Sequence, residues 1–236
     1  MSGRLSGRLA LIAGASRGIG AAVAKRFAAE GAHVVLTGRT VGGLEATDDA
    51  IRAAGGSATL SPFDLTDFDA IDRLGGVLAE RYGHLDVLVG NAAALGQLSP
   101  MGHIPPDVWD EVVGVNLTAQ WRLIRAFDPL LRAADAGRAI FVTSSVASQP
   151  HAYWGVYAAT KAALENMVRT WAAELMKTRV RVNLIDPGAV RTAMRAAAYP
   201  GEDPQTLPPP EAVTERFVEL AEDACARHGE VVRAVD

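Results

Sequence analysis

The stretch Leu9-Ala-Leu-Ile-Ala-Gly14-Ala-Ser-Arg-Gly18-Ile-Gly20 leads from an apolar run directly into a glycine-rich turn. The run is apolar at every position, which is typical of a parallel strand buried on both faces. A helical pattern, Ala21–Glu30, follows. Glycines between a strand and a helix let the backbone approach a pyrophosphate, and the helix N-terminus adds amide donors and a positive dipole. The stretch therefore predicts a nucleotide site; the alternative is a glycine-rich turn without a ligand.

Short apolar runs and longer helical segments alternate along the rest of the chain. The predicted strands are Leu9–Ala13, His33–Thr37, Ala58–Pro62, Leu85–Val89, Ala139–Thr143 and Val180–Ile185, and helices between them include Ala21–Glu30, Val41–Ala54 and Asp67–Tyr82. This alternation predicts parallel strands joined by crossovers, with helices on both faces. We therefore expect an α/β fold, a single doubly wound, Rossmann-like domain over residues 1–236.

The carboxyl-terminal part is interrupted by prolines. Five of them lie between Tyr199 and Pro210, which predicts a loop there. A last helix over about Glu211–Ala226 and a closing strand over Val231–Ala234 are expected after it.

Composition and charge exclude several functions. The 236 residues carry a net charge of −4 and 6% aromatic residues, without the basic stripe of a nucleic-acid binder. No apolar run reaches the roughly 18 residues of a membrane span, and Leu9–Ala13 is too short for a signal sequence. The five histidines are scattered without metal-ligand spacing. The single cysteine, Cys225, fits a reducing compartment. We expect a cytoplasmic protein without metal, nucleic acid or membrane partners.

Tyr157 and Lys161 lie four residues apart on a predicted helix, whose apolar stripe is Leu164, Val168, Trp171 and Leu175. This spacing places both side chains on one helical face. A phenol is a poor base at neutral pH, but a neighbouring ammonium favours the phenolate and lowers the pKa of the phenol. The pair is therefore a candidate device for proton transfer; the alternative is that both side chains face solvent.

The combination Gly14-x-x-x-Gly18-x-Gly20 and Tyr157-x-x-x-Lys161 resembles the short-chain dehydrogenase/reductase family. Further marks of the family follow in order from Leu9 to Thr192: Asp64-Leu-Thr-Asp, Asn91-Ala-Ala, Asn116 within Val-Asn-Leu-Thr, Ser144, and Pro187-Gly-Ala-Val-Arg-Thr192. Two positions depart from it. The usual Thr before the first glycine is Ala13, and the usual Asn-Asn-Ala-Gly reads Gly90-Asn91-Ala92-Ala93. Neither change removes a reacting group.

The resemblance implies a catalytic tetrad of Asn116, Ser144, Tyr157 and Lys161. Ser144 would orient the substrate carbonyl and Tyr157 would exchange a proton with its oxygen, so both are substrate-binding. Ser144 is preferred over Ser145 because it lies thirteen residues before Tyr157, which is the family spacing. Lys161 would bind the nicotinamide ribose and keep the phenol acidic, and Asn116 would hold a water that connects Lys161 to solvent.

The resemblance also implies a set of cofactor-binding residues. They are Gly14, Ser16, Arg17, Gly18, Ile19, Gly20, Arg39, Asp64, Leu65, Asn91, Ala92, Ala93, Tyr157, Lys161, Pro187, Gly188, Val190 and Thr192. A free ribose 2′-hydroxyl is usually held by an acid near the end of the second strand, but no acid lies between Ala32 and Leu44. Arg39, helped by Arg17, offers a guanidinium to a 2′-phosphate instead, which favours NADP(H) over NAD(H).

These observations predict an NADP(H)-dependent oxidoreductase that interconverts a carbonyl and a secondary alcohol of a small molecule. The alternative is a cofactor-binding sensor or regulatory protein without turnover. An epimerase or dehydratase of the extended branch would need a larger carboxyl-terminal domain. Residues at about 193–211 are the expected substrate-loop segment, with Leu95, Gln149, Tyr153, Trp154 and Met194 as candidate pocket walls.

A homodimer or homotetramer is expected from the helices that carry Asn116 and Tyr157. Both are interpreted as apolar all round, with Trp121, Leu123, Phe127, Met167 and Trp171 among their residues.

Overall fold

A seven-stranded parallel sheet forms the centre of the computed structural model, which describes residues 3–234. The strand order is β3-β2-β1-β4-β5-β6-β7, and all six neighbouring pairs are parallel. The strands are β1 Leu9–Ala13, β2 His33–Gly38, β3 Ser57–Pro62, β4 Val87–Gly90, β5 Arg138–Val142, β6 Arg181–Asp186 and β7 Val231–Arg233. The expected α/β fold is confirmed, with strand ends that differ by up to two residues from the predicted ones. Residues 1, 2, 235 and 236 of the expected domain lie outside the described residues.

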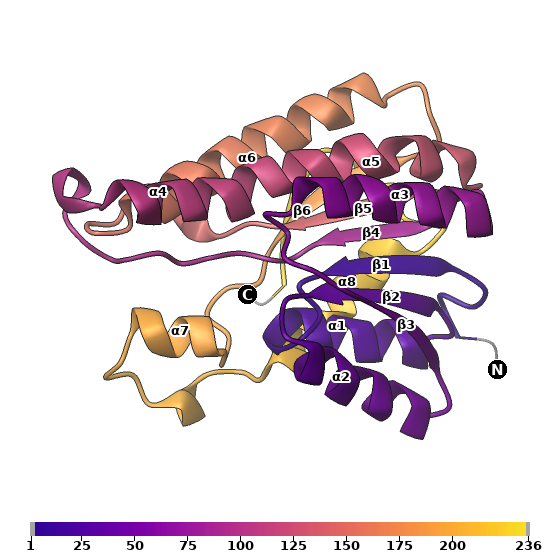
Figure 1. Cartoon of the computed structure of the whole chain (residues 1–236), viewed down its shortest axis with the longest axis horizontal. Coiled ribbons are helices and arrows are strands. Elements are labelled where there is room, and N and C mark those ends of the chain that lie inside the picture. Colours follow the sequence, from indigo (N-terminus) through magenta and orange to yellow (C-terminus); the bar gives the residue numbers. More distant parts are fainter. Residues whose placement is uncertain (1–2, 235–236) are drawn as a thin grey trace.

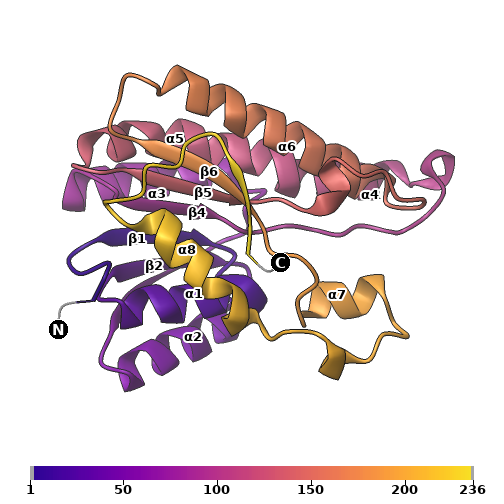
Figure 2. The same cartoon turned by 180° about the vertical axis from the view of Figure 1, so that it is seen from behind.

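Helices cover both faces of this sheet. They are α1 Gly18–Ala29, α2 Val41–Ala53, α3 Phe68–Tyr82, α4 Pro106–Val113, α5 Ala119–Ala133, α6 Gly155–Glu174, α7 Ala193–Ala198 and α8 Thr214–Ala221. Figure 1 shows α3, α5 and α6 on one face and α1 and α2 on the other. Figure 2 shows α8 beside α1. Within residues 3–234, no helix is both long enough and apolar enough to cross a membrane.

The alternation of side chains along β1 explains why its run is apolar throughout. Leu9 and Leu11 belong to the core under α3, α5 and α6, whereas Ala10 and Ile12 belong to the core under α1 and α8. All four are at most 4% exposed. Full burial of an aliphatic side chain contributes about 1.5–3 kcal/mol, so a polar residue anywhere in this strand would be costly.

The last helix is shorter than the sequence pattern predicts. Residues Pro210–Val213 form a 3-10 turn, and α8 ends at Ala221 rather than at residue 226. Beyond α8 the backbone is extended at Glu222, whose carbonyl oxygen accepts a hydrogen bond from Nε of the buried Arg138 at 2.9 Å. A buried guanidinium requires such acceptors, and the backbone just beyond α8 supplies one.

Helix α5 has one polar face, so the expectation of an apolar surface all round is wrong for it. Leu123 and Phe127 are buried, but Trp121 is 46% exposed. Arg125 pairs with Asp72 of α3 at 2.8 Å on the outer face. The stripe predicted for α6 is confirmed, because Leu164, Val168, Trp171 and Leu175 are all at most 5% exposed.

Candidate active site

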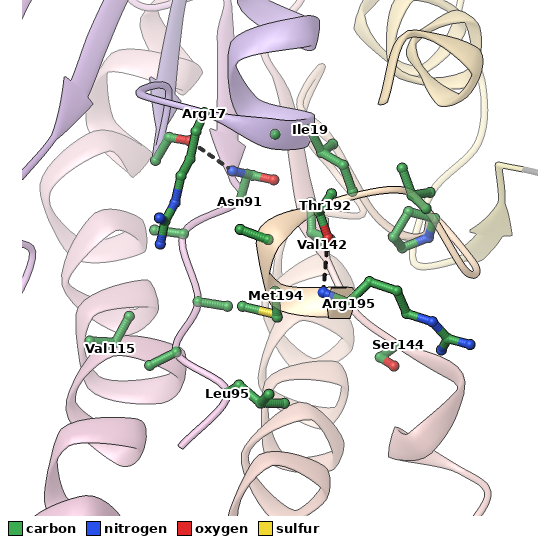
Figure 3. A pocket seen from close by; sticks show the side chains of 18 of the residues that line it. Arg17, Ile19, Asn91, Leu95, Val115, Val142, Ser144, Thr192, Met194 and Arg195 are labelled. Atoms are coloured by element: carbon green, nitrogen blue, oxygen red, sulfur yellow. Dashed lines mark hydrogen bonds between the residues drawn. The ribbon is translucent and has the colours of Figure 1, made fainter. Parts of the chain in front are cut away.

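A cavity of about 750 Å³ lies at the carboxyl ends of the strands. The strand order reverses between β1 and β4, where open α/β sheets bind ligands. Figure 3 shows Arg17 and Asn91 toward one end of the cavity and Leu95 and Ser144 toward the other. The sequence-predicted residues that line it are Gly14, Ser16, Arg17, Gly18, Ile19, Arg39, Asp64, Leu65, Asn91, Ala92, Ala93, Ser144, Tyr157, Lys161, Pro187, Gly188, Val190 and Thr192. Gly20 and Asn116 are buried behind the lining.

The glycine turn between β1 and α1 is packed too tightly for side chains. A Cβ at Gly20 would lie 2.1 Å from the carbonyl oxygen of Gly14 and 2.5 Å from Nδ2 of Asn91. Asn91 Nδ2 donates a hydrogen bond to the same carbonyl oxygen at 3.0 Å, which ties the end of β4 to the turn. Gly18 has a φ of 58°, which disfavours other residues.

Helix α1 starts at this turn without a side-chain cap at Arg17. The first amide groups of a helix have no partner within it, so they are available to an anion. This uncapped start and the crowded glycines fit a pyrophosphate held against the backbone.

Arg39 lies at the opening of the cavity, at the end of β2. Its Nη1 lies 3.5 Å from Oδ2 of Asp64, and both side chains are substantially exposed. Burial alone would raise the pKa of Asp64, but hydrogen bonds from Thr66 and the charge of Arg39 hold it below its ordinary value. Arg17 is exposed beside the same cavity. The two guanidinium groups therefore give this end of the cavity a positive character.

Tyr157 and Lys161 lie on α6 at the inner end of the cavity, and they are 7% and 2% exposed. The ammonium of Lys161 lies 5.6 Å from the centre of the Tyr157 ring and donates a hydrogen bond to the carbonyl oxygen of Val142 at 2.8 Å. No ion pair of Lys161 occurs within residues 3–234. In the described part of the chain, this buried ammonium therefore has a backbone carbonyl and the Tyr157 ring beside it, rather than a carboxylate.

The expectation that Lys161 makes the phenol acidic is not met, because the pKa of Tyr157 is raised rather than lowered. Burial, followed by the negative charge of Asp186, raises the pKa of Tyr157 to about 12, although a hydrogen bond with Ser144 opposes this. Burial also lowers the pKa of Lys161 to about 8. The cause is desolvation, which the spacing of Tyr157 and Lys161 in the sequence does not reveal.

Asn116 lies in a π-helical turn, Gly114–Thr118, between α4 and α5. Its Oδ1 accepts a hydrogen bond from the amide of Ala94 at 2.8 Å. Its Nδ2 donates to the carbonyl oxygen of Ala94 at 2.9 Å and to Oγ1 of Thr160 at 3.1 Å. Both Nδ2 hydrogens are thus given to protein atoms, and the expectation that Asn116 holds a water stays a prediction. The side chain ties the segment after β4 to the turn of α6 between Tyr157 and Lys161.

The segment after β6 forms another part of the wall. Gly188 has a φ of 70°, and its amide donates a hydrogen bond to Oδ1 of Asp186 at 3.0 Å. Thr192 Oγ1 accepts a hydrogen bond from the amide of Arg195 at 3.2 Å and so caps α7. The expected substrate-loop segment therefore begins with an ordered helix.

Aromatic rings link α7 to the start of α6. The Trp154 ring lies 5.7 Å from the ring of Tyr157 and 5.8 Å from that of Tyr199, centre to centre. The guanidinium of Arg195 lies 3.8 Å from the Tyr199 ring centre and pairs with Glu202 through two 2.6 Å hydrogen bonds.

Three of the five expected wall residues line the cavity, namely Leu95, Trp154 and Met194. Gln149 and Tyr153 are exposed outside it, so that part of the expectation is wrong. Tyr153 has a φ of 73°, and its carbonyl oxygen accepts a hydrogen bond from the amide of Ser99. Sequence reasoning missed Asp186, Thr160 and Tyr199. Their site partners Tyr157, Asn116 and Trp154 lie 29, 44 and 45 residues away, which is too far for spacing to reveal them.

Comparison with known proteins identifies the family. A family model for the short chain dehydrogenases matches residues 8–203. The chain therefore belongs to the short chain dehydrogenase family of oxidoreductases, and the resemblance found in the sequence is confirmed. Among its relatives is the uncharacterized oxidoreductase YciK of Escherichia coli (strain K12). It is 39% identical over 227 residues, covering 94% of this chain and 89% of YciK.

Two similar solved structures contain a nicotinamide cofactor. A short chain dehydrogenase from Escherichia coli CFT073, complexed with NADPH, has a TM-score of 0.95 and 38% identity, and the match covers 100% of both chains. One from Shigella flexneri 2a, complexed with NADP, has a TM-score of 0.95 and 37% identity over 99% of each chain.

Proposed function

We propose that this chain is an NADP(H)-dependent oxidoreductase that interconverts a carbonyl and a secondary alcohol. The observation that carries the proposal is the meeting of Ser144, Tyr157 and Lys161 at the inner end of a cavity that also contains the glycine turn. The NADPH and NADP in the two similar structures support the same class of cofactor here.

The residues present fit such a cofactor. The turn Gly14–Gly20 and the uncapped start of α1 would hold the pyrophosphate. Arg39, with Arg17, would bind the 2′-phosphate in place of its pairing with Asp64. Pro187–Val190 and Thr192 would hold the carboxamide, and Lys161 would hold the ribose hydroxyls. Since an ammonium has three donors and one is given to Val142, two remain for the ribose.

When bound, NADPH supplies a hydride. The Ser144 hydroxyl would donate a hydrogen bond to the carbonyl oxygen and so orient it. Tyr157, which burial keeps protonated, would give its proton to the same oxygen. Asn116 would act as a positioning residue, because its amide fixes Ala94 in the cavity wall and Thr160 on the turn of α6 between Tyr157 and Lys161.

Residues 1–236 would act as one domain, in which the segment 193–211 closes over the substrate. Leu95, Trp154 and Met194 form a largely apolar wall, and Arg195 is neutralised by Glu202. This favours a small, uncharged carbonyl compound as substrate. A homodimer or homotetramer remains part of the proposal, with exposed Trp121 on α5 as a residue available for contact.

Turnover distinguishes the enzyme from a sensor. NADPH and NADH would first be titrated into the protein by calorimetry, and NADPH oxidation would then be followed against a panel of aldehydes and ketones. The proposal expects tighter binding of NADPH and oxidation with at least one carbonyl compound. Tight binding without turnover across a broad panel would favour the cofactor-binding sensor. Light scattering that finds only a 24.8 kDa species would reject the oligomer.

A further inference from the structure

Asp186, the last residue of β6, is a buried acid in the cavity wall to which the proposed function gives no role. It is 9% exposed, and only one other acid, Asp64, is found among the cavity-lining residues. Asp64 lies at the Arg39 end and is paired there. Asp186 makes no ion pair within the described residues 3–234. Its charge is therefore not neutralised by a neighbouring cation.

The backbone fixes where this carboxylate lies. The amide of Thr143 donates a hydrogen bond to the carbonyl oxygen of Ile185 at 2.8 Å, so the end of β6 is beside the residue preceding Ser144. Oδ1 of Asp186 accepts a hydrogen bond from the amide of Gly188 at 3.0 Å. The carbonyl oxygen of Asp186 accepts a hydrogen bond from the amide of Ala234 at 2.9 Å. These contacts hold the side chain at the inner end of the cavity.

The titratable groups that share this end of the cavity are Tyr157 and Lys161 from α6. Asp186 and Tyr157 line the same cavity, and after burial the negative charge of Asp186 is the next cause that raises the pKa of Tyr157. A phenol that stays protonated is suited to give a proton to a carbonyl oxygen and poorly suited to take one from an alcohol.

We expect the nicotinamide ring near the same carboxylate, because the proposed carboxamide site, Pro187–Val190, directly follows Asp186 in the cavity wall. In the proposed reaction the carbonyl oxygen is hydrogen-bonded to Tyr157, and reacting atoms in a productive complex are about 3–3.5 Å apart. The carbonyl carbon takes the hydride with both electrons, and its oxygen takes the Tyr157 proton, leaving an alcohol and the oxidised cofactor. The ring is neutral before this step and cationic after it, so a fixed negative charge nearby stabilises the product form and the developing positive charge.

We propose that the Asp186 carboxylate makes this site bind the oxidised, cationic nicotinamide more tightly than the reduced form, and thereby shifts the equilibrium between the bound reactants toward the alcohol. This inference rests on the proposed function. It concerns the charge of one residue rather than the identity of the substrate. Measurements of cofactor binding, made without any substrate, therefore test it.

The test compares dissociation constants for NADP⁺ and NADPH, measured by calorimetry at one pH, in the parent and in Asp186→Asn. An asparagine keeps the Oδ1 acceptor for the Gly188 amide and removes the charge. The proposal expects the parent to bind NADP⁺ more tightly than NADPH. It expects Asp186→Asn to weaken NADP⁺ binding at least tenfold and to change NADPH binding less than threefold. Asp64→Asn removes the other acid of the cavity and should leave the ratio of the two constants unchanged.

The possible results separate the two proposals. An unchanged ratio in Asp186→Asn, with both forms still bound, would overturn the role of Asp186 and leave the proposed function intact. A parent that binds neither form would overturn both. If Asp186→Asn does not fold, Asp186→Ser offers the same loss of charge. The parent alone is also decisive, because tighter binding of NADPH than of NADP⁺ would contradict the inference.

Discussion

The Lys161 ammonium lies 5.6 Å from the centre of the Tyr157 ring, and the two buried side chains are pushed toward their neutral forms. Burial disfavours a charge on either group, so the phenol holds its proton and the ammonium loses its proton more easily. The pair is therefore arranged to donate a proton to a bound oxygen.

The buried Lys161 should make stability depend on pH. Its pKa is 10.5 in an ordinary environment and about 8 in the fold. As pH falls from 10.5 to 8, the unfolded chain takes up the proton first, so the free energy of unfolding should decrease, by up to about 3 kcal/mol. Lys161→Met should flatten this dependence and be more stable than the parent at pH 8. Urea unfolding between pH 8 and 9.5 measures it, because Tyr157 of the unfolded chain, with an ordinary pKa of 10.0, is still mostly protonated there. The exposed Lys25→Met serves as control, and parallel curves for parent and Lys161→Met would reject the prediction.

Arg39 should select NADPH over NADH. A hydrogen bond to a charged group contributes about 1.5–3 kcal/mol, so Arg39→Ala should weaken NADPH binding about tenfold to a hundredfold. NADH has no 2′-phosphate, and its affinity should change less than threefold. Arg73→Ala is a matched control, because Arg73 also forms an exposed pair with an aspartate, Asp67, but lies outside the cavity. Equal losses for both cofactors in Arg39→Ala would argue against a phosphate contact.

Gly20→Ala should disrupt the glycine turn. The new Cβ would lie 2.1 Å from the carbonyl oxygen of Gly14, so β1 and α1 must move apart. We expect a loss of about 1–3 kcal/mol in unfolding free energy and loss of NADPH binding. Gly42→Ala, at the start of α2, has no atom within 4 Å of its Cβ and should retain both stability and binding. Thermal unfolding and calorimetry on the two variants would show this contrast, and similar behaviour of both would contradict it.

Tyr199 should hold α7 over the substrate. Its ring contacts the ring of Trp154, and such an aromatic pair contributes about 0.5–1.5 kcal/mol. The guanidinium of Arg195 lies over the same ring, and such a cation–π contact contributes about 0.5–1 kcal/mol. Tyr199→Ala should therefore raise KM for a carbonyl substrate about tenfold while kcat changes less than threefold. Tyr199→Phe keeps the ring and should restore KM. A large fall in kcat for Tyr199→Ala, with unchanged KM, would show that the ring acts on the chemical step instead.

The fold, the glycine turn and the shared helical face of Tyr157 and Lys161 could be predicted from the sequence, because local rules govern them. The limits of β1 follow from its uninterrupted apolar run, and the glycine turn follows from the strand and helix on either side of it. The common face of Tyr157 and Lys161 follows from helical spacing alone.

The remaining features depend on contacts between distant parts of the chain. The partners of Asn116 are Ala94 and Thr160, which lie 22 and 44 residues away. The carbonyl oxygen of Glu222, just after α8, is paired with Arg138, more than 80 residues earlier. The raised pKa of Tyr157 comes from burial and from Asp186, neither of which a spacing rule contains. Long-range packing therefore determined what the sequence pattern could not.

In the proposed function, Tyr157 transfers the proton during turnover. The most direct measurement compares kcat for NADPH-dependent carbonyl reduction, and the dissociation constant for NADPH, in the parent and in Tyr157→Phe. The phenylalanine keeps the ring beside Trp154 and Lys161 and removes only the hydroxyl. General acid catalysis contributes about 10²–10⁴-fold, so kcat should fall by at least a hundredfold while NADPH binding changes less than threefold. A variant that keeps kcat within tenfold of the parent would contradict the assignment.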